Sequence, residues 1–509
     1  MRNFVKAIVG PRVAHRNAAR DIAWNYAGYL YQISINLGLT SYVARYLAVP
    51  EYGLFLLVMS LSATLYLLDM GISSVLIQVY VAASVSAEGN RFNDLLSTTF
   101  WALTALGTAG VLIFAALASA LPGPFNIPHE YLHEASVIFV IAALVIQVGL
   151  PTIALEQAYQ ARHRFDRINQ IQLLIATLQL VLSILVVAAG FRIVALAIVQ
   201  LAVAAVRLLI LALALPASVP QARLHFARFK WCELKPLLHL SKWAFVNNLC
   251  ASLFDIAAWT ILGTLGSMRE AAMFGLATKL PAQLRNLVDK GAHVALPLWS
   301  QASAESNHAN LARTYLKVQK LVFGAVLPFV TLGCIFAQPL LRVWAGSQYS
   351  AAGLVMQWLL LAALSYAFAY ASDLLLYACG RVKKAAFIAL WGGIISAASG
   401  LLLVPRYGAA GLAAGMAVTQ LVVNCTWFTS EACKICRISQ WILLREILDG
   451  LAWPVLVLCI EIVLIWSVSS YLRPHWLVLA AVLSGCVYLA LWGARTALPL
   501  YRSQGEIPG

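Results

Sequence analysis

The sequence predicts an all-α polytopic membrane protein with about 14 transmembrane helices, arranged as two pseudo-twofold six-helix bundles and two C-terminal helices. Three observations lead to this fold class: 62% of the 509 residues are hydrophobic, only 11% are charged, and long apolar runs recur along the chain. A soluble domain carries far more charge on its surface. The cytoplasmic loops of membrane proteins collect Lys and Arg, so the formal net charge of +15 has to be compared first with the distribution of basic residues among the loops.

Fourteen segments are long enough to span a bilayer, because a spanning helix needs about 20 mainly apolar residues. They lie at 22–46, 53–81, 95–120, 132–157, 168–189, 192–215, 242–265, 271–298, 315–338, 353–378, 384–404, 409–430, 447–470 and 475–497. The first is the least hydrophobic and contains Asn25, Gln32 and Asn36, which suit a helix facing a wet interior. The expected parts are a basic tail (1–21), an N-terminal bundle (22–215), a linker (216–241), a C-terminal bundle (242–430), a loop (431–446), two extra helices (447–498) and a C-terminal tail (499–509).

The basic residues orient these spans. With the N-terminus inside, the inner segments hold 24 Lys and Arg residues and the outer loops hold six. Cytoplasmic loops collect positive charge, so both termini of this multi-pass protein are predicted to be cytoplasmic. Much of the net charge is therefore topological, and no nucleic-acid partner is expected.

The second half of the chain repeats the first. "LLDMGISSVL" begins at Leu67 and "LVDKGAHVAL" begins at Leu287, 220 positions later, and both contain Asp-x-Gly. The same offset lays spans 1 to 6 over spans 7 to 12. An even number of helices per repeat keeps both halves in one orientation, with an axis along the membrane normal. This pattern is typical of transporters that work by alternating access.

Charges inside the eighth predicted span are the main candidates for a substrate site. Lys279 lies about 13 Å from the outer end of its helix, at 1.5 Å per residue, and Asp255 reaches a similar depth on the preceding span. These two residues are able to pair. Arg285 and Asp289 are spaced to form a second pair on one helical face. Pro281 is expected to bend the helix beside Lys279.

Two interpretations of these charges remain open. In the first, all of them close internal salt bridges between helices. In the second, Lys279 or Arg285 faces a wet cavity, and the cation that remains after pairing selects an anionic ligand. Arg207, within the sixth span, and Asn25 are further candidates for substrate binding.

Asp69 and Asp373 lie towards the inner ends of their predicted helices, and Asp289 repeats Asp69. They are capping or hinge residues, or they couple transport to protons or sodium ions. "CKIC" (Cys433 to Cys436) has no second pair and no neighbouring histidine, so two loop thiols are expected there. No catalytic residue, metal ligand or cofactor is predicted.

Several motifs resemble the Wzx-type polysaccharide and O-antigen flippases of the multidrug/oligosaccharidyl-lipid/polysaccharide exporter superfamily. "YVARYLAVPEYGLF" (Tyr42 to Phe55) precedes "LLDMGISSVLIQ" in the first half. "WAFVNNLCASLFDIAAWTILGTLGSMREAAMFGLATKLPAQL" contains Asp255 and Lys279, and "LPLWSQASAE" and "PLLRVWAGSQYSAAG" follow it. The resemblance covers roughly residues 20–430, and the order and spacing of the motifs make it specific.

The resemblance implies a flippase of the bacterial inner (plasma) membrane, and not an enzyme. Its substrate would be an undecaprenyl-pyrophosphate-linked oligosaccharide, moved to the outer leaflet for O-antigen, exopolysaccharide or capsule synthesis. A basic cavity is able to replace the hydration of the pyrophosphate. The expected partners are the lipid-linked oligosaccharide, membrane lipids and a polysaccharide polymerase complex.

Two other functions are alternatives to this one. A cation-coupled multidrug exporter of the same fold would need an acidic cavity. A membrane glycosyltransferase or polymerase would need room outside the bilayer for its catalytic acids, whereas the longest outer loop is Leu121 to His133.

Overall fold

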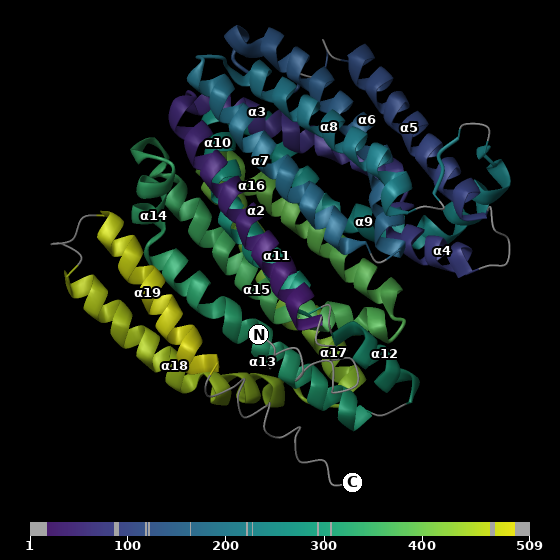
Figure 1. The fold of residues 1–509 in the computed structure, drawn as a ribbon. Coiled ribbons are helices and arrows are strands. Elements are labelled where there is room, and N and C mark those ends of the chain that lie inside the picture. Colours follow the sequence, from purple (N-terminus) through teal and green to yellow (C-terminus); the bar gives the residue numbers. More distant parts are fainter. Residues whose placement is uncertain are drawn as a thin grey trace. The chain divides into compact units, whose positions relative to one another are not determined.

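The computed structural model describes residues 18–85, 91–117, 120, 123–162, 164–219, 222–225, 228–292, 295–305, 308–468 and 474–493. Within these ranges every regular element is a helix (Figure 1). In chain order they are α2 Ala18–Tyr46, α3 Val49–Ser62, η1 Ala63–Asp69, α4 Ser73–Val85, α5 Arg91–Leu117, η2 His129–Tyr131, α6 Leu132–Ala161, α7 Phe165–Ala188, α8 Ile193–Ser218, α9 Trp231–Leu265, α10 Met268–Ala277, α11 Lys279–Ala292, α12 Leu296–Ala304, α13 His308–Ile335, α14 Ala337–Trp344, η5 Ser347–Tyr349, α15 Ala352–Ala378, α16 Val382–Val422, η6 Val423–Phe428, α17 Thr429–Cys436, α18 Gln440–Val468 and α19 Pro474–Trp492.

The predicted fold class is confirmed: the chain is an all-α, multi-pass membrane protein. In the described ranges nine helices are long and apolar enough to cross a membrane, and the bent pair 440–449 and 451–465 makes a tenth. One of the nine, Val382–Cys436, covers two predicted spans, which meet at Gly408 with φ 55° and ψ −140°. Three predicted spans, 22–46, 242–265 and 271–298, are not among these ten, although helices lie in all three; Ser252–Leu265 is a shorter apolar helix.

The chain packs as two compact units. Described residues within 27–272 form the N-terminal unit, and described residues from 273 to 493, with 18–26, form the C-terminal unit. Helix α9, which the sequence assigned to the second bundle, packs against α3, α4 and α5 in the N-terminal unit. The bundle limits 22–215 and 242–430 were drawn from the repeat, which packing does not have to follow, and they stay a prediction.

One central helix organises each unit. In the N-terminal unit, α6 contacts α3, α4, α5, α7 and α8. Its core face includes Leu155 and Tyr159, both fully buried, and the Tyr159 hydroxyl donates to the carbonyl of Leu211 on α8 at 3.0 Å. In the C-terminal unit, α15 has this central role and contacts α11, α12, α13, α14 and α16. The hydroxyls of Tyr315 on α13 and Ser372 on α15 lie 2.7 Å apart.

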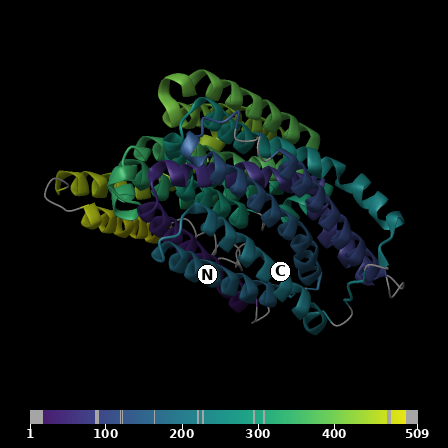
Figure 2. The same cartoon turned by 90° about the horizontal axis from the view of Figure 1, so that it is seen from above.

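The helix bounds follow the 220-residue repeat. Adding 220 to the bounds of α6 gives 352–381, where α15 lies, and adding 220 to those of α5 gives 311–337, where α13 lies. The last two helices, α18 and α19, fall outside the repeat. They lie side by side in Figures 1 and 2 and pack against α13.

The second span of each repeat is broken, and this corrects two predictions. The span predicted at 271–298 is divided into α10, α11 and α12, with a turn at Thr278. This turn directly precedes Lys279, where the bend was predicted, and Pro281 follows it in the first turn of α11, where its missing N–H is tolerated. The span predicted at 53–81 breaks after η1, where Met70 and Gly71 both have positive φ.

Two helices extend into the linker predicted at 216–241, whose bounds stay a prediction. Helix α8 continues to Ser218 and α9 already begins at Trp231. The chain between them is attached to α5, because Asp94 accepts a hydrogen bond from Lys230 Nζ at 2.6 Å and Thr98 accepts one from the Lys230 amide at 3.0 Å. The hydrogen bond to Asp94 raises the pKa of Lys230, because it stabilises the charged form of the lysine.

Candidate functional site

The C-terminal unit holds a polar cluster around Arg285 on α11. Its guanidinium carbon lies 5.7 Å from the ring centre of Tyr366 on α15, within the range of a cation–π contact. Its Nη2 donates to Gln420 Oε1 on α16 at 3.4 Å. The Nε of Arg285 is buried and has no hydrogen-bond partner in the described part of the chain. A guanidinium with a spare buried donor is suited to a further polar ligand.

Tyr366 connects Arg285 with Asp289. The Tyr366 hydroxyl donates to Asp289 Oδ1 at 2.6 Å, while its ring lies beside the guanidinium. The sequence predicted a direct pair between Arg285 and Asp289, and the structure brings both to one tyrosine. Tyr366 itself was missed, although Tyr366, Tyr370 and Asp373 recur at helical spacing in an otherwise apolar span.

Asp373 adds a second carboxylate to this cluster. It lies on α15 close enough to interact electrostatically with Asp289, and the rings of Tyr366 and Tyr370 are 5.1 Å apart. The described cluster contains one guanidinium and two carboxyl groups, whereas the expected surplus of positive charge also counted Lys279 and Lys290 and stays a prediction. Charge counting along the eighth span alone could not include Asp373, which is contributed by another helix.

Lys279 is the first residue of α11. Its side chain is partly buried, and among the described residues of the C-terminal unit no carboxylate forms an ion pair with it. Its predicted partner, Asp255, is an exposed side chain on α9 in the N-terminal unit. The pairing of Lys279 with Asp255 joins residues of different units and stays a prediction.

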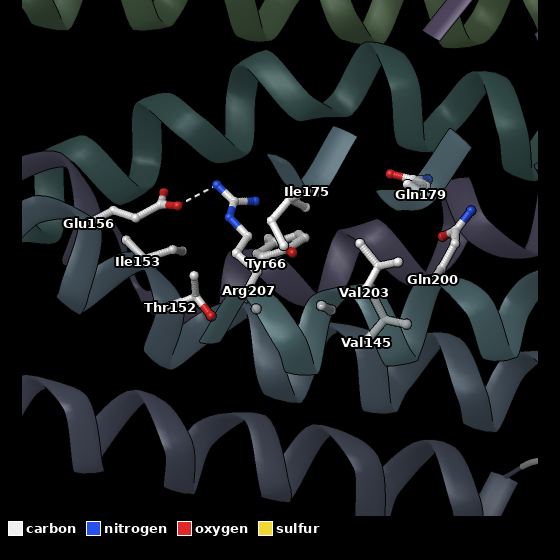
Figure 3. Close-up of a pocket in the computed structure, with 12 residues that line it drawn as sticks. Tyr66, Val145, Thr152, Ile153, Glu156, Ile175, Gln179, Gln200, Val203 and Arg207 are labelled. Carbon is white, nitrogen blue, oxygen red and sulfur yellow. Dashed lines mark hydrogen bonds and ion pairs between the residues drawn. The ribbon is translucent and has the colours of Figure 1, made fainter. Parts of the chain in front are cut away.

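The N-terminal unit contains a cavity of about 240 Å³ between η1, α6, α7 and α8. Its polar lining residues are Tyr66, Thr152, Glu156, Gln179, Gln200 and Arg207. Arg207 Nη2 donates to Glu156 Oε1, and Figure 3 shows this pair at one end of the cavity and the two glutamines at the other. Arg207, predicted to bind substrate, thus pairs with Glu156, which sequence reasoning missed. The sequence feature that could have identified Glu156 is an acidic residue near the end of an apolar span.

The cavity and the Arg285 cluster occupy equivalent places in the repeat. Adding 220 turns the cavity residue Gln200 into Gln420, which binds Arg285. The same shift turns Ile153 into Asp373. The two halves therefore carry polar sites at corresponding positions of the repeat, and these sites differ in charge.

Asp69 belongs to neither site. Asp69 accepts hydrogen bonds from the amide of Gly71 at 2.7 Å and from the amide of Ser73 at 3.4 Å, which caps the turn before α4. Its repeat partner Asp289 lies inside α11, so the two Asp-x-Gly copies differ in local structure. The side chain of Asn25 lies outside the described residues.

No group of three or more potential ligands that could hold a metal ion occurs among the residues that the structure describes. Cys433 and Cys436 are free thiols buried on α17, not in a loop. Their burial, in a chain segment without further ligands, gives them a packing role.

Residues 42–353 match a family described as "Polysaccharide biosynthesis protein". No curated protein matches the chain. Among solved structures, the lipid II flippase MurJ in an inward closed conformation is similar, with TM-score 0.73 and 13% identity, covering 93% of this chain and 99% of that chain. A multidrug resistance MATE family transporter of the MOP superfamily, facing inward, has TM-score 0.68 and 17% identity, covering 80% and 96%. The same family in an outward-facing conformation gives 0.58 and 15%, covering 81% and 94%. At these identities the likeness concerns the fold.

Proposed function

We propose that this chain, which belongs to the polysaccharide biosynthesis protein family, flips undecaprenyl-pyrophosphate-linked oligosaccharide repeat units between membrane leaflets. The family and the transporter fold support a transporter of a lipid-linked substrate. The direction is from the inner to the outer leaflet of the bacterial inner membrane, for surface polysaccharide synthesis. The chain then acts by alternating access and catalyses no covalent chemistry.

The observation that carries the proposal is the spare donor capacity of Arg285. Its Nε–H is buried without a partner among the described residues, and only one side-chain hydrogen bond, to Gln420, satisfies its guanidinium. Burying a charged group in a membrane costs several kcal/mol unless it is satisfied. A pyrophosphate oxygen would accept from the free N–H groups, since guanidinium and phosphate form strong charge-assisted hydrogen bonds. Lys279 would add a second cation for the same headgroup.

Asp289 and Asp373 are the proposed coupling residues. Two carboxylates near one guanidinium are able to exchange a proton or share a sodium ion. An anionic headgroup bound at Arg285 would neutralise the positive charge of the guanidinium near these two acids. Asp69 is not part of this proposal, because its carboxylate caps a turn.

The proposed topology places both termini in the cytoplasm, as the distribution of basic residues predicts. The polyprenyl tail would remain in lipid while the headgroup crosses. A polysaccharide polymerase complex is the proposed protein partner on the outer side, where the product emerges.

The test is transport by purified protein in lipid vesicles that contain a lipid-linked oligosaccharide. Arg285→Ala and Lys279→Ala are expected to abolish transport while the reconstituted amount of protein stays near normal. Arg406→Ala, at an exposed arginine of the same unit, is the matched control and should be silent. Loss of folded protein in the Arg285→Ala and Lys279→Ala variants would instead indicate that these two charges stabilise the fold and do not bind substrate.

Two further outcomes would contradict parts of the proposal. Transport that is indifferent to both proton and sodium gradients would refute the coupling role of Asp289 and Asp373. Export of lipophilic cations, without movement of the lipid-linked oligosaccharide, would favour the multidrug alternative.

A further inference from the structure

The cavity of the N-terminal unit has unused hydrogen-bonding groups. In the described part of the chain, the amides of Gln179 and Gln200 have no hydrogen-bond partner, and Arg207 Nε is buried and unpaired. Glu156 uses one carboxylate oxygen for Arg207, which leaves its other oxygen as an acceptor. Donors and acceptors are thus both present in an intramembrane site, where unsatisfied polar groups are costly.

The charges of this cavity select against an ionic ligand. Glu156 and Arg207 are its only charged lining residues and they pair with each other, so the lining has no net charge. An anion that approached Arg207 would meet Glu156, and a cation that approached Glu156 would meet Arg207. A neutral molecule with several hydroxyls gains most, because each hydroxyl both donates and accepts.

The shape of the cavity fits a single ring. Its volume of about 240 Å³ lies below the roughly 300–1,000 Å³ of pockets for drug-sized ligands. Tyr66, whose side chain reaches the cavity from η1, offers an aromatic wall. Gly149 makes room for this ring, since a Cβ at that position would collide with the Tyr66 hydroxyl.

We infer that this cavity is a subsite for one uncharged sugar ring, held by Gln179 and Gln200 at one end and by the Glu156–Arg207 pair at the other. The inference rests on the proposed function for the source of the sugar, which is the glycan of the lipid-linked substrate. The subsite lies within one unit and is separate from the Arg285 cluster. It assigns the saccharide part of the substrate to the N-terminal unit.

Binding of free monosaccharides to the full-length protein in nanodiscs tests the inference, with saturation-transfer NMR as the measurement. The probes are glucose and N-acetylglucosamine as neutral sugars, glucuronate as an anion and glucosamine as a cation. The neutral sugars are expected to bind and the charged ones to bind at least about tenfold more weakly. Gln179→Leu combined with Gln200→Leu is expected to weaken neutral-sugar binding roughly tenfold.

Two variants keep the test specific. Gln147→Leu is the matched control, because this glutamine lies on α6 outside the cavity lining and donates to Thr108. It is expected to leave sugar binding unchanged. Ala204→Leu adds bulk to the lining without removing a polar group and is expected to abolish binding, so the inference stays testable even if the glutamine variants fold poorly.

The outcomes separate this inference from the proposed function. Binding of a free sugar needs neither a lipid-linked substrate nor an ion gradient, so a failure of transport leaves the subsite unaffected. Transport with no detectable sugar binding would refute the subsite alone. Equal binding by wild type and Ala204→Leu, or a preference for glucuronate, would also overturn it.

Discussion

Tyr366→Phe isolates one of the two contacts that Tyr366 makes with Arg285 and Asp289 of α11. The tyrosine hydroxyl donates to Asp289 Oδ1 at 2.6 Å, and the ring faces Arg285 at 5.7 Å. Phenylalanine keeps the ring and removes only the hydroxyl. The substitution therefore removes the bond to Asp289 and preserves the cation–π contact with Arg285.

The size of the effect depends on the charge of Asp289. A hydrogen bond to an ionised group contributes about 1.5–3 kcal/mol, whereas interhelical hydrogen bonds in a membrane protein average about 0.6 kcal/mol. We therefore expect Tyr366→Phe to lower the free energy of unfolding by about 0.6–3 kcal/mol, with the upper part of this range for an ionised Asp289 and the lower part for a neutral one. Removing the ring as well, in Tyr366→Leu, should cost a further 0.5–1 kcal/mol, roughly, from the lost cation–π contact.

Equilibrium unfolding of the purified protein in mixed micelles measures these differences. Tyr407→Phe, at an exposed tyrosine in the same unit, is the control for loss of a hydroxyl and should be neutral. A double-mutant cycle with Asp289→Asn then isolates the energy of the Tyr366–Asp289 contact. A coupling energy near zero would refute the reasoning, because the two side chains would not then interact in the folded protein.

Three further predictions concern stability. Arg207→Met should cost about 2 kcal/mol, between the values for exposed and buried ion pairs, since Glu156 is 17% exposed and Arg207 is 35% exposed; adding Glu156→Leu should recover most of it, as thermal unfolding would measure. Gly53→Ala places a Cβ against a backbone carbonyl of α10 and should cost at least about 1–3 kcal/mol, whereas Gly38→Ala, with no heavy atom within 4 Å, should stabilise its helix by about 0.5–1 kcal/mol. Asp69→Ala should cost about 0.5–2 kcal/mol through its lost cap and leave the ion dependence of transport unchanged; altered ion dependence in vesicles would contradict the capping role.

The sequence predicted the fold because the fold depends on local properties. Length and hydropathy define spanning helices, and the two Asp-x-Gly copies gave the repeat offset that α6 and α15 obey. The weakest boundaries were those of the segments richest in polar residues. There the helices break, as at Thr278, and hydropathy windows cannot locate such breaks.

The sites were harder to predict because their contacts join distant parts of the chain. Arg285 and Gln420 are 135 positions apart, and Arg207 and Glu156 are 51 positions apart. A charge pattern along one helix shows which residues share a face, but not which neighbour faces them. Arg285 and Asp289 were identified correctly as members of one helical face, whereas Tyr366 required the packing of α15 against α11.

The repeat identifies a substitution that makes the Arg285 cluster resemble the cavity of the N-terminal unit. Asp373 in the C-terminal unit corresponds to Ile153 in the cavity of the N-terminal unit. Asp373→Ile therefore gives the Arg285 cluster the residue that the neutral cavity already has, and leaves Asp289 as the remaining acid described for the cluster. We expect this variant to lose the dependence of transport on an ion gradient and to keep sugar binding unchanged, because the cavity lies in the other unit. Unaltered ion dependence would show that the second carboxylate is not needed for coupling, and lost sugar binding would show that the two sites do not act separately.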